Sequence, residues 1–583
     1  MKQVVLLTLI CMFFSCEDQK QDKIEEFQTH FELSEYKETA TYLQVIDFYI
    51  RLAKEFPEIN IQTIGETDSG YPLHLVTFNI DGDFNFQKIG KNKTVILINN
   101  GIHPGESDGI DATMLLYRDL ATGKVDAPEN TVLATIPVYN VGGALNRNSF
   151  SRANQNGPTS YGFRGNAQNY DLNRDFIKVD TKNAVTFASI FHLVQPDIFI
   201  DNHVSNGADY QYTLTHLFTQ HNKLGGDLGN YLNKRMMPKL SKLLQEDNWE
   251  ITPYVNVFNK VPESGFSQFM DYPRYSTGYT TLWNTLGMMV ETHMLKPYEK
   301  RVEGTYELMV KMIAIAEEDG KNIKTLRKEA LTRHMDWTHY PVQWKIDTTR
   351  TSTLKFRGYE ADTLISEVTG LPRLKYDRTK PFTKEVNYSD YFIPTDSVAI
   401  PEAYILKKGW HKVIELLNLN NIEYTKIDKD TTLSVESYRI ADYKTQQNPY
   451  EGHYPHSDTK VSKEIKTVSF SQGDYYIPTN QTGIRYLLET LEPQATDSFF
   501  NWNFFDTILQ QKEGFSPYVF EDVALEILQK DPELKAEFDR TKDSSATFSA
   551  NWYKQLDWLF KNSKYYEDAH LQYPVYRILK SVD

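Results

Sequence analysis

Residues 99–109 read NNGIHPGESDG, and the rest of the chain is organised around this stretch. The apolar run at residues 94–98 has the length and β-branching of a buried strand, and residues 110–120 carry apolar side chains at helical spacing. His103 and Glu106 therefore lie on a tight loop at the carboxyl end of a core strand, where open α/β sheets bind ligands. An imidazole and a carboxylate three residues apart suit two positions of a Zn²⁺ site.

The N-terminal residues have the pattern of an export signal. A positive charge precedes an apolar segment at residues 4–14, which is too short to span a bilayer and ends close to Cys16. We therefore predict a signal at residues 1–16. Its ending resembles a bacterial lipoprotein signal, which implies that Cys16 is lipidated and anchors an exported protein to the cell envelope, on its periplasmic or surface face. An ordinary signal peptide cut nearby is the alternative, and residues 17–32 are predicted to be a polar tether.

Length and composition indicate a globular protein with more than one domain. The chain has 583 residues, of which 40% are hydrophobic and 13% aromatic, enough to fill substantial cores. Its net charge of -15 argues against nucleic acid or anionic lipid as a partner. No stretch after the signal is apolar enough to span a membrane, so we expect membrane contact only through the N-terminal lipid.

Strand and helix signals alternate through the first half of the chain. Residues 41–56 have an apolar helical face, residues 61–64 and 73–78 read as a hairpin, and residues 132–138 read as a buried strand. The alternation predicts an α/β domain with a mixed, mostly parallel sheet and helices on both faces. We expect this domain to span residues 33–325.

Further polar residues follow the first pair in an order that suits catalysis. A long aperiodic loop at residues 140–170, typical of a functional or a disordered segment, leads into the pair Asn173-Arg174. Such a pair suits capture of a carboxylate, because the guanidinium fork matches two oxygens. A second apolar strand ends in His203, which can supply a third metal ligand. A third ends in Glu291, which fits a general base beside a metal-bound water or, alternatively, a buried ion pair.

Taken together, these residues resemble the catalytic set of the M14 (carboxypeptidase A-like) zinc carboxypeptidases, from about residue 36 to about residue 316. The resemblance implies one Zn²⁺ per chain and hydrolysis of a peptide bond near a free C-terminus by a zinc-activated water. It implies His103, Glu106 and His203 as zinc ligands, Glu291 as the general base, Arg152 (with Arg147 as a competitor) beside the scissile carbonyl, and Asn173, Arg174 and Tyr275 (with Tyr272 and Tyr279 as alternatives) around the substrate terminus.

Two other readings of the function stay open. The broader family includes enzymes with other substrates, so a peptidoglycan stem-peptide hydrolase or an N-acyl amino acid deacylase is an alternative to a carboxypeptidase. A non-catalytic binding lipoprotein is an alternative of another class. The presence of three ligands together with Glu291 argues against it, because a binding role needs none of them.

The second half of the chain falls outside the resemblance. Residues 326–395 contain short alternating runs and are predicted to be a β-rich connecting region. Residues 396–583 contain a strand, helix and strand pattern and are predicted to be a smaller α/β or α+β accessory domain. Residues 498–505 are densely aromatic, which suits docking against another domain or lining a groove. We assign no chemistry to this half.

Overall fold

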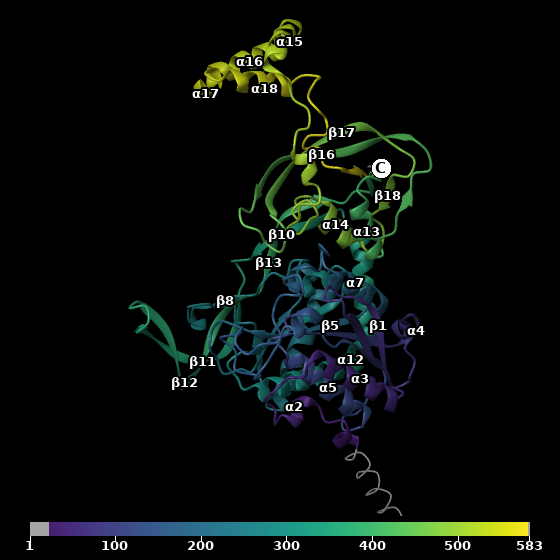
Figure 1. The fold of residues 1–583 in the computed structure, drawn as a ribbon, viewed down its shortest axis with the longest axis vertical. Helices are drawn as coiled ribbons and strands as arrows, with labels where there is room; N and C mark the ends of the chain where they lie inside the picture. The colour runs from purple at the N-terminus through teal and green to yellow at the C-terminus, as the bar shows by residue number, and fades with distance from the viewer. Residues whose placement is uncertain (1–22, 581–583) are drawn as a thin grey trace, which may run out of the picture.

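The computed structural model describes residues 23–580, so the predicted signal peptide and its Cys16 lie outside the described residues. The described chain forms an elongated molecule with a large lower body, a smaller sheet-rich body above it and a helical unit at the far end (Figure 1). Within residues 23–580, no helix combines the length and the apolarity that crossing a membrane requires.

The lower body is built on an eight-stranded mixed sheet with the strand order β1-β2-β4-β3-β5-β9-β6-β7. Four of its seven neighbouring pairs are parallel, among them the central run β4-β3-β5-β9. The central strands are buried because they are continuous apolar runs, as expected of strands covered on both faces. The strands are β1 (Ile59–Glu66), β2 (Pro72–Phe78), β3 (Thr94–Asn100), β4 (Thr131–Ile136), β5 (Ile198–Ser205), β6 (Leu214–Phe218), β7 (Ile251–Pro253) and β9 (Leu286–His293).

Helices cover both faces of this sheet, which confirms the predicted fold class. In Figure 1, α7 lies above the sheet, and α3, α5 and α12 lie below it. Shorter helices fill the connections. The helices of this body are α2 (His30–Leu33), α3 (Tyr42–Glu55), α4 (Phe86–Asn92), α5 (Asp108–Ala121), α6 (Val141–Leu145), α7 (Lys182–Val194), α8 (His221–Leu224), α9 (Gly226–Tyr231), α10 (Met237–Glu246), α11 (Ser276–Thr281) and α12 (Tyr298–Met335).

The two ends of this body differ from the sequence prediction. The predicted boundary between residues 325 and 326 falls inside α12, because apolar side chains such as Ile323 and Ala330 continue on its buried face. The predicted tether at residues 17–32 is too long, because Phe27 and Phe31 are buried in the core. Packing of these two phenylalanines places the start of the folded body before residue 33.

The segment after α12 is β-rich, as predicted, but its predicted end at residue 395 lies within a strand. β10 (His339–Ile346) pairs antiparallel with β13 (Phe392–Ala399) along its length. Between them, β11 (Ser352–Ile365) and β12 (Pro372–Ser389) form a long hairpin that projects sideways from the body (Figure 1). The base of this hairpin joins the lower body through a parallel pair between β12 and β8 (Phe266–Ser267).

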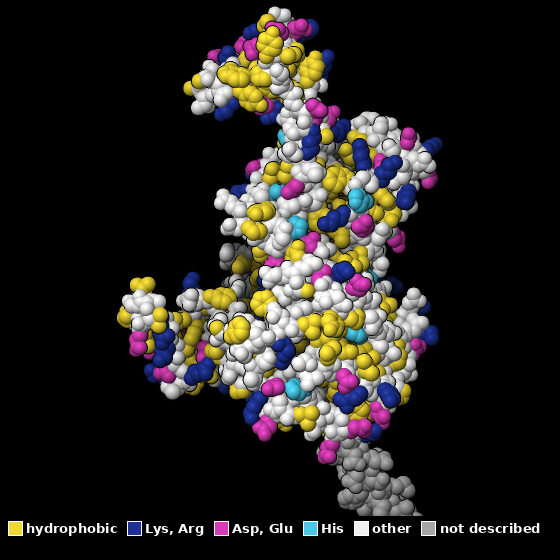
Figure 2. Space-filling view, viewed as in Figure 1, with side chains coloured by type: hydrophobic (Ala, Val, Ile, Leu, Met, Phe, Trp, Pro, Cys, Tyr) yellow, Lys and Arg dark blue, Asp and Glu magenta, His cyan; other side chains and the backbone are white. Residues whose placement is uncertain are grey.

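The upper body is an α+β unit built on a six-stranded antiparallel sheet with the order β15-β18-β14-β19-β16-β17. The chain then forms a separate helical unit, which has its own small apolar core and surface hydrophobic patches (Figure 2). The elements are β14 (Ala403–Leu406), α13 (His411–Leu419), β15 (Thr425–Lys426), β16 (Thr431–Thr445), β17 (His456–Phe470), β18 (Tyr475–Pro478), α14 (Ile484–Leu491), α15 (Pro517–Lys530), α16 (Pro532–Ser544), α17 (Ala546–Ser549), α18 (Trp552–Lys561) and β19 (Val575–Ile578).

Candidate metal centre and active site

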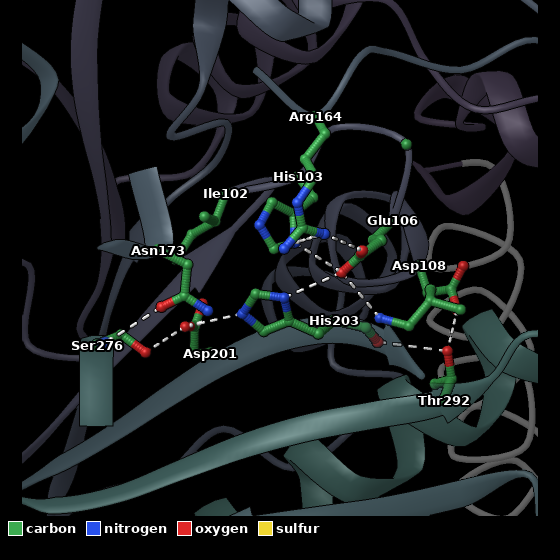
Figure 3. A network of polar contacts seen from close by, with 12 residues as sticks. Ile102, His103, Glu106, Asp108, Arg164, Asn173, Asp201, His203, Ser276 and Thr292 are labelled. Carbon is green, nitrogen blue, oxygen red and sulfur yellow. Dashed lines mark hydrogen bonds and ion pairs between the residues drawn. The ribbon is translucent and has the colours of Figure 1, made fainter. Parts of the chain in front are cut away.

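Three potential metal ligands meet at the carboxyl ends of two neighbouring strands. His103 and Glu106 follow β3, and His203 lies near the end of β5, which pairs with β3 in parallel register. One ligand atom from each of the three lies within 4.8 Å of the others (Figure 3). All three side chains are buried. The structure therefore brings together the three residues that the sequence predicts as a metal site.

The two imidazoles present the same ring nitrogen to the centre. Nδ1 of His103 lies 3.1 Å and Nδ1 of His203 lies 3.0 Å from Oε2 of Glu106. On the far side of each ring, Nε2 lies 3.0 Å from a carboxylate oxygen of Asp171 or Asp201. A carboxylate that accepts a hydrogen bond from Nε2 leaves the Nδ1 lone pair free for a metal. Two imidazoles and one carboxylate with an open fourth position fit a catalytic Zn²⁺ site.

Positive charge surrounds the carboxylate of this set. Nη2 of Arg152 lies 2.9 Å from Oε1 of Glu106, and Nη1 of Arg164 lies 3.7 Å from the same oxygen. Burial opposes ionisation of Glu106, but the charges of His103 and Arg152 outweigh it and hold the pKa of this carboxyl well below its usual range. Glu106 is therefore an anion that is ready to bind a cation.

Glu291 stands beside the metal site on the next strand. It lies on β9 directly opposite His203 of β5 and lines the same cavity as the three ligands. Burial raises the pKa of Glu291 to about 8, against the opposing charge of His203. A carboxyl group in this environment accepts a proton readily, which is the property required of a general base.

The predicted carboxylate anchors line this cavity too. Asn173 and Arg174 lie in a short 3₁₀ turn, and Tyr275 immediately precedes α11. The guanidinium carbon of Arg174 lies 4.6 Å from the centroid of the Tyr275 ring, and the Ser276 backbone N–H donates to Oδ1 of Asn173 at 3.3 Å. The cavity measures about 210 Å³, against about 30 Å³ for one water in the liquid. It has room for a side chain of a bound molecule.

The structure distinguishes among the three tyrosines that the sequence offers for the position near the substrate terminus. Tyr275 lines the cavity, whereas Tyr272 and Tyr279 do not. The hydroxyl of Tyr279 donates to Asn420 at 2.6 Å inside the core. Tyr272 lies instead next to the buried Lys223, whose Nζ is 5.8 Å from its ring centroid.

The arginines of the loop at residues 140–170 differ in their position relative to the cavity, and the sequence does not predict this difference. The guanidinium group of Arg147 donates hydrogen bonds to the backbone carbonyls of Thr39, Ala40 and Ser160. Arg152 reaches Glu106 but does not line the cavity. Arg164 does line it, with Nη1 3.4 Å from Nδ1 of His103 (Figure 3). Arg164 is therefore a further cation at the centre.

Asp171 and Asp201 are also part of the site and are absent from the predicted set. Asp201 precedes His203 by two residues on one strand, so the two side chains share a face, and this spacing is a usable signal. Asp171 precedes Asn173 by two residues, on a turn without periodicity. Arg164 has no comparable signal, since it lies in an aperiodic loop.

A comparison with protein families agrees with part of this geometry. Residues 45–197 match the peptidase family M14, described as zinc carboxypeptidase. This part of the chain carries His103 and Glu106 and ends before His203. A comparison with curated proteins gave no match.

Solved structures with a similar fold include three carboxypeptidases. A metallo-carboxypeptidase from Burkholderia cenocepacia is 15% identical, covers 46% of this chain and 67% of its own, and has a TM-score of 0.35. A carboxypeptidase A from Helicoverpa armigera is 14% identical, covers 48% and 74%, and has a TM-score of 0.37. A metallo-carboxypeptidase from Pseudomonas aeruginosa is 13% identical, covers 47% and 69%, and has a TM-score of 0.36.

Proposed function

We propose that this chain, whose residues 45–197 belong to the zinc carboxypeptidase family, removes amino acids from the free C-termini of peptides. One observation carries the proposal. The ligand set His103, Glu106 and His203, a half-buried carboxyl group at Glu291 and the cationic anchor Arg174 all border one cavity. A binding protein does not require a general base beside a metal site.

Different residues of the chain have separate roles in the proposed reaction. His103, Glu106 and His203 would hold a Zn²⁺, which would supply Lewis acidity towards the scissile carbonyl and lower the pKa of a water at the site. Glu291 accepts the proton of the attacking water and then delivers it to the departing amine. Arg164 and Arg152 are the cations closest to the ligands, and they stabilise the negative charge that develops on the carbonyl oxygen.

Specificity for a chain end follows from the anchors. Arg174 offers a planar fork of donors to a terminal carboxylate, and Asn173 and Tyr275 border the same end of the cavity. A peptide bond in the middle of a chain presents no such carboxylate. Only the last bond of a substrate is therefore held against Glu291.

We also propose that the protein acts outside the cytoplasm, tethered by a lipid on Cys16. The pattern of residues 1–16 supports this location, and the net charge of -15 supports a protein that does not bind anionic surfaces by itself. Cell-wall stem peptides and N-acyl amino acids also end in a carboxylate, so both belong in any substrate panel.

The deciding experiment is hydrolysis of a mixed peptide library by the chain that begins after Cys16, read by mass spectrometry. We expect loss of single residues from free C-termini, abolished by a zinc chelator and restored by Zn²⁺. Amidated C-termini are the control and should stay intact. Cleavage of cell-wall peptides or acyl amino acids alone would show that the protein is a stem-peptide hydrolase or a deacylase rather than a carboxypeptidase. Zinc-loaded protein that cleaves none of these substrates would favour a binding role.

A further inference from the structure

A turn of the upper body lies against the segment that contains two of the substrate anchors. Between β16 and β17 the chain makes a tight turn, in which Tyr450 and His453 exchange backbone hydrogen bonds of 2.8 and 3.1 Å. Oε2 of Glu451 in this turn accepts from the backbone N–H of Asp171 at 2.8 Å. Asp171 directly precedes the 3₁₀ turn at residues 172–174. A side chain of the upper body therefore reaches the edge of the active site.

The backbone of this turn is unusual for the residues in it. Glu451 and Gly452 have φ of 48° and 78°, so both central positions are left-handed, as in a type I′ hairpin turn. Asparagine, aspartate or glycine is preferred at the first of these positions, because larger side chains crowd the backbone there. Residues in such strained conformations cluster where the side chain has a function. The hydrogen bond from Asp171 is the use that the structure shows for the Glu451 side chain.

The two residues after Glu451 hold the turn against the same segment of the lower body. Gly452 is so close to Tyr170 that a Cβ atom on Gly452 would lie 2.6 Å from the tyrosine hydroxyl oxygen. Nε2 of His453 lies 2.7 Å from Oδ2 of Asp180. The Glu451 carboxylate is therefore presented by a turn whose own position is fixed by close contacts.

Asp171 connects Glu451 to the anchors and to the metal site. Oδ1 of Asp171 accepts from the backbone N–H of Asn173, and its backbone oxygen accepts from that of Arg174, both at 3.0 Å. The same Oδ1 atom lies 3.0 Å from Nε2 of His103. A shift of the Asp171 backbone therefore moves the two anchors, which belong to the same turn. His103 lies on a different segment, after β3.

We propose that Glu451 is a positioning residue of the active site, which fixes the turn at residues 171–174 so that Asn173 and Arg174 meet the terminal carboxylate of a substrate. This inference rests on the proposed function, because it concerns the anchors of the same site. Glu451 does not line the cavity and acts through Asp171. The upper body, to which the sequence assigns no chemistry, thus supports the anchor end of the site.

The first test is the kinetics of peptide hydrolysis by the zinc-loaded chain that begins after Cys16. We expect Glu451→Ala to raise KM by about 10-fold and to change kcat by less than about 3-fold, because the anchors lose their support while the metal ligands keep theirs. Glu451→Gln keeps an oxygen that can accept from the Asp171 N–H, so its KM should stay within about 3-fold of the wild-type value. An unchanged KM in Glu451→Ala overturns the proposal.

The matched control is Asp430→Ala. Oδ1 of Asp430 accepts from the backbone N–H of Gln472 at 2.9 Å, so this carboxylate makes the same kind of bond as Glu451 but within the upper body. We expect wild-type KM and kcat in this variant. An equal rise of KM in Asp430→Ala and in Glu451→Ala would show that general loosening of the upper body is the cause, which contradicts a specific role for Glu451.

Hydrogen exchange separates this inference from the proposed function, because it requires no hydrolysis. Exchange of the backbone N–H groups at residues 171–176 is followed by mass spectrometry in the wild type and in the variants. We expect at least about 10-fold faster exchange in Glu451→Ala and no change in Asp430→Ala. If exchange rises in this way but the wild type cleaves no peptide, only the proposed reaction fails. Unchanged exchange in Glu451→Ala overturns the inference even if peptides are cleaved.

Discussion

At the scale of single residues, carboxylates fix the orientation of the two imidazoles of the candidate metal site. The outer nitrogen of each imidazole lies 3.0 Å from a carboxylate oxygen, that of Asp171 for His103 and that of Asp201 for His203. Asp201 is itself fixed by donors from Asn99 and Ser276. Such outer partners set the ring orientation and the tautomer, which makes the site ready for the metal.

The carboxylate of Asp201 should therefore matter for zinc affinity although it does not touch the metal. We expect Asp201→Asn to weaken zinc binding by about 10–100-fold, because the outer nitrogen of His203 loses a charged acceptor. Competition with a fluorescent chelator measures the change. The control is Asp209→Asn, since Asp209 also lies 3.0 Å from a histidine, His293, outside the ligand set. Wild-type affinity in Asp201→Asn would contradict the argument.

Glu291 should be required for turnover and dispensable for zinc. We expect Glu291→Gln to keep one zinc per chain and to lower kcat by about 10³-fold, because the amide cannot accept the proton of the attacking water. Zinc content by elemental analysis and kcat on one peptide give the two readouts. Near-normal turnover would remove Glu291 from the role of base.

The sequence predicts the ligands and Glu291 because each follows or ends an apolar strand, and strand ends meet at one edge of a parallel sheet. Arg164 and Glu451 escape prediction for the opposite reason. Both lie in segments without periodicity, where the position of a side chain depends on contacts with distant parts of the chain. Glu451 contacts Asp171, 280 residues away in the sequence.

At the scale of elements, the segment that carries Tyr275 is held in place by the upper body. Arg274 donates to Asp497 from its backbone N–H and from Nε, both at 2.8 Å. Its guanidinium carbon also lies 5.0 Å from the Trp502 ring centroid. The aromatic segment at residues 498–505 therefore contacts Arg274, the neighbour of the proposed substrate anchor Tyr275.

Loss of this contact should affect substrate binding more than chemistry. We expect Asp497→Ala to raise KM with a smaller change in kcat, because Tyr275 is no longer fixed near Arg174. Stability should fall by about 3–5 kcal/mol, since the substitution leaves a largely buried arginine unpaired. Denaturant unfolding and steady-state kinetics measure both. The control Glu318→Ala removes an exposed carboxylate whose partner Lys239 keeps a second ion pair with Asp319, so it should change stability by less than about 1 kcal/mol. An unchanged KM in Asp497→Ala would argue against the positioning role.

Element boundaries were harder to predict than element types. Six strands of the sheet, β1 to β5 and β9, and the helices α3 and α5 follow from periodicity, but the strands β6 and β7 and the end of α12 do not. Its C-terminal half is largely polar, with buried apolar positions such as Ile323 and Ala330 widely spaced. Tertiary packing stabilises such a segment as helix where the local pattern is weak.

At the scale of the whole molecule, the chain leaves the upper body and returns to it. After α14 it forms the helical unit α15–α18, whose apolar core is separate from the main core. It then returns as β19, which lies between β14 and β16 inside the six-stranded sheet. The sequence gives no sign of this return, because pairing between strands distant in the chain leaves no local pattern.

The helical unit should therefore be removable, whereas β19 should not. The two ends of the unit meet, because the carboxylate of Glu567 accepts from the backbone N–H groups of Lys512 and Glu513. We expect replacement of residues 514–566 by a short Gly-Ser linker to preserve zinc binding and kcat/KM. A chain that ends at residue 513 lacks β19 as well.

The chain that ends at residue 513 is compared with the linker variant to test the contribution of β19. It exposes the edges of β14 and β16 and removes Arg577, which is buried against Glu492 of the upper body. We expect it to be insoluble or to unfold at a much lower temperature than the linker variant. Thermal unfolding and peptide hydrolysis of the two chains give the answer. Loss of activity in the linker variant, with its melting temperature unchanged, would instead assign the helical unit a part in substrate capture.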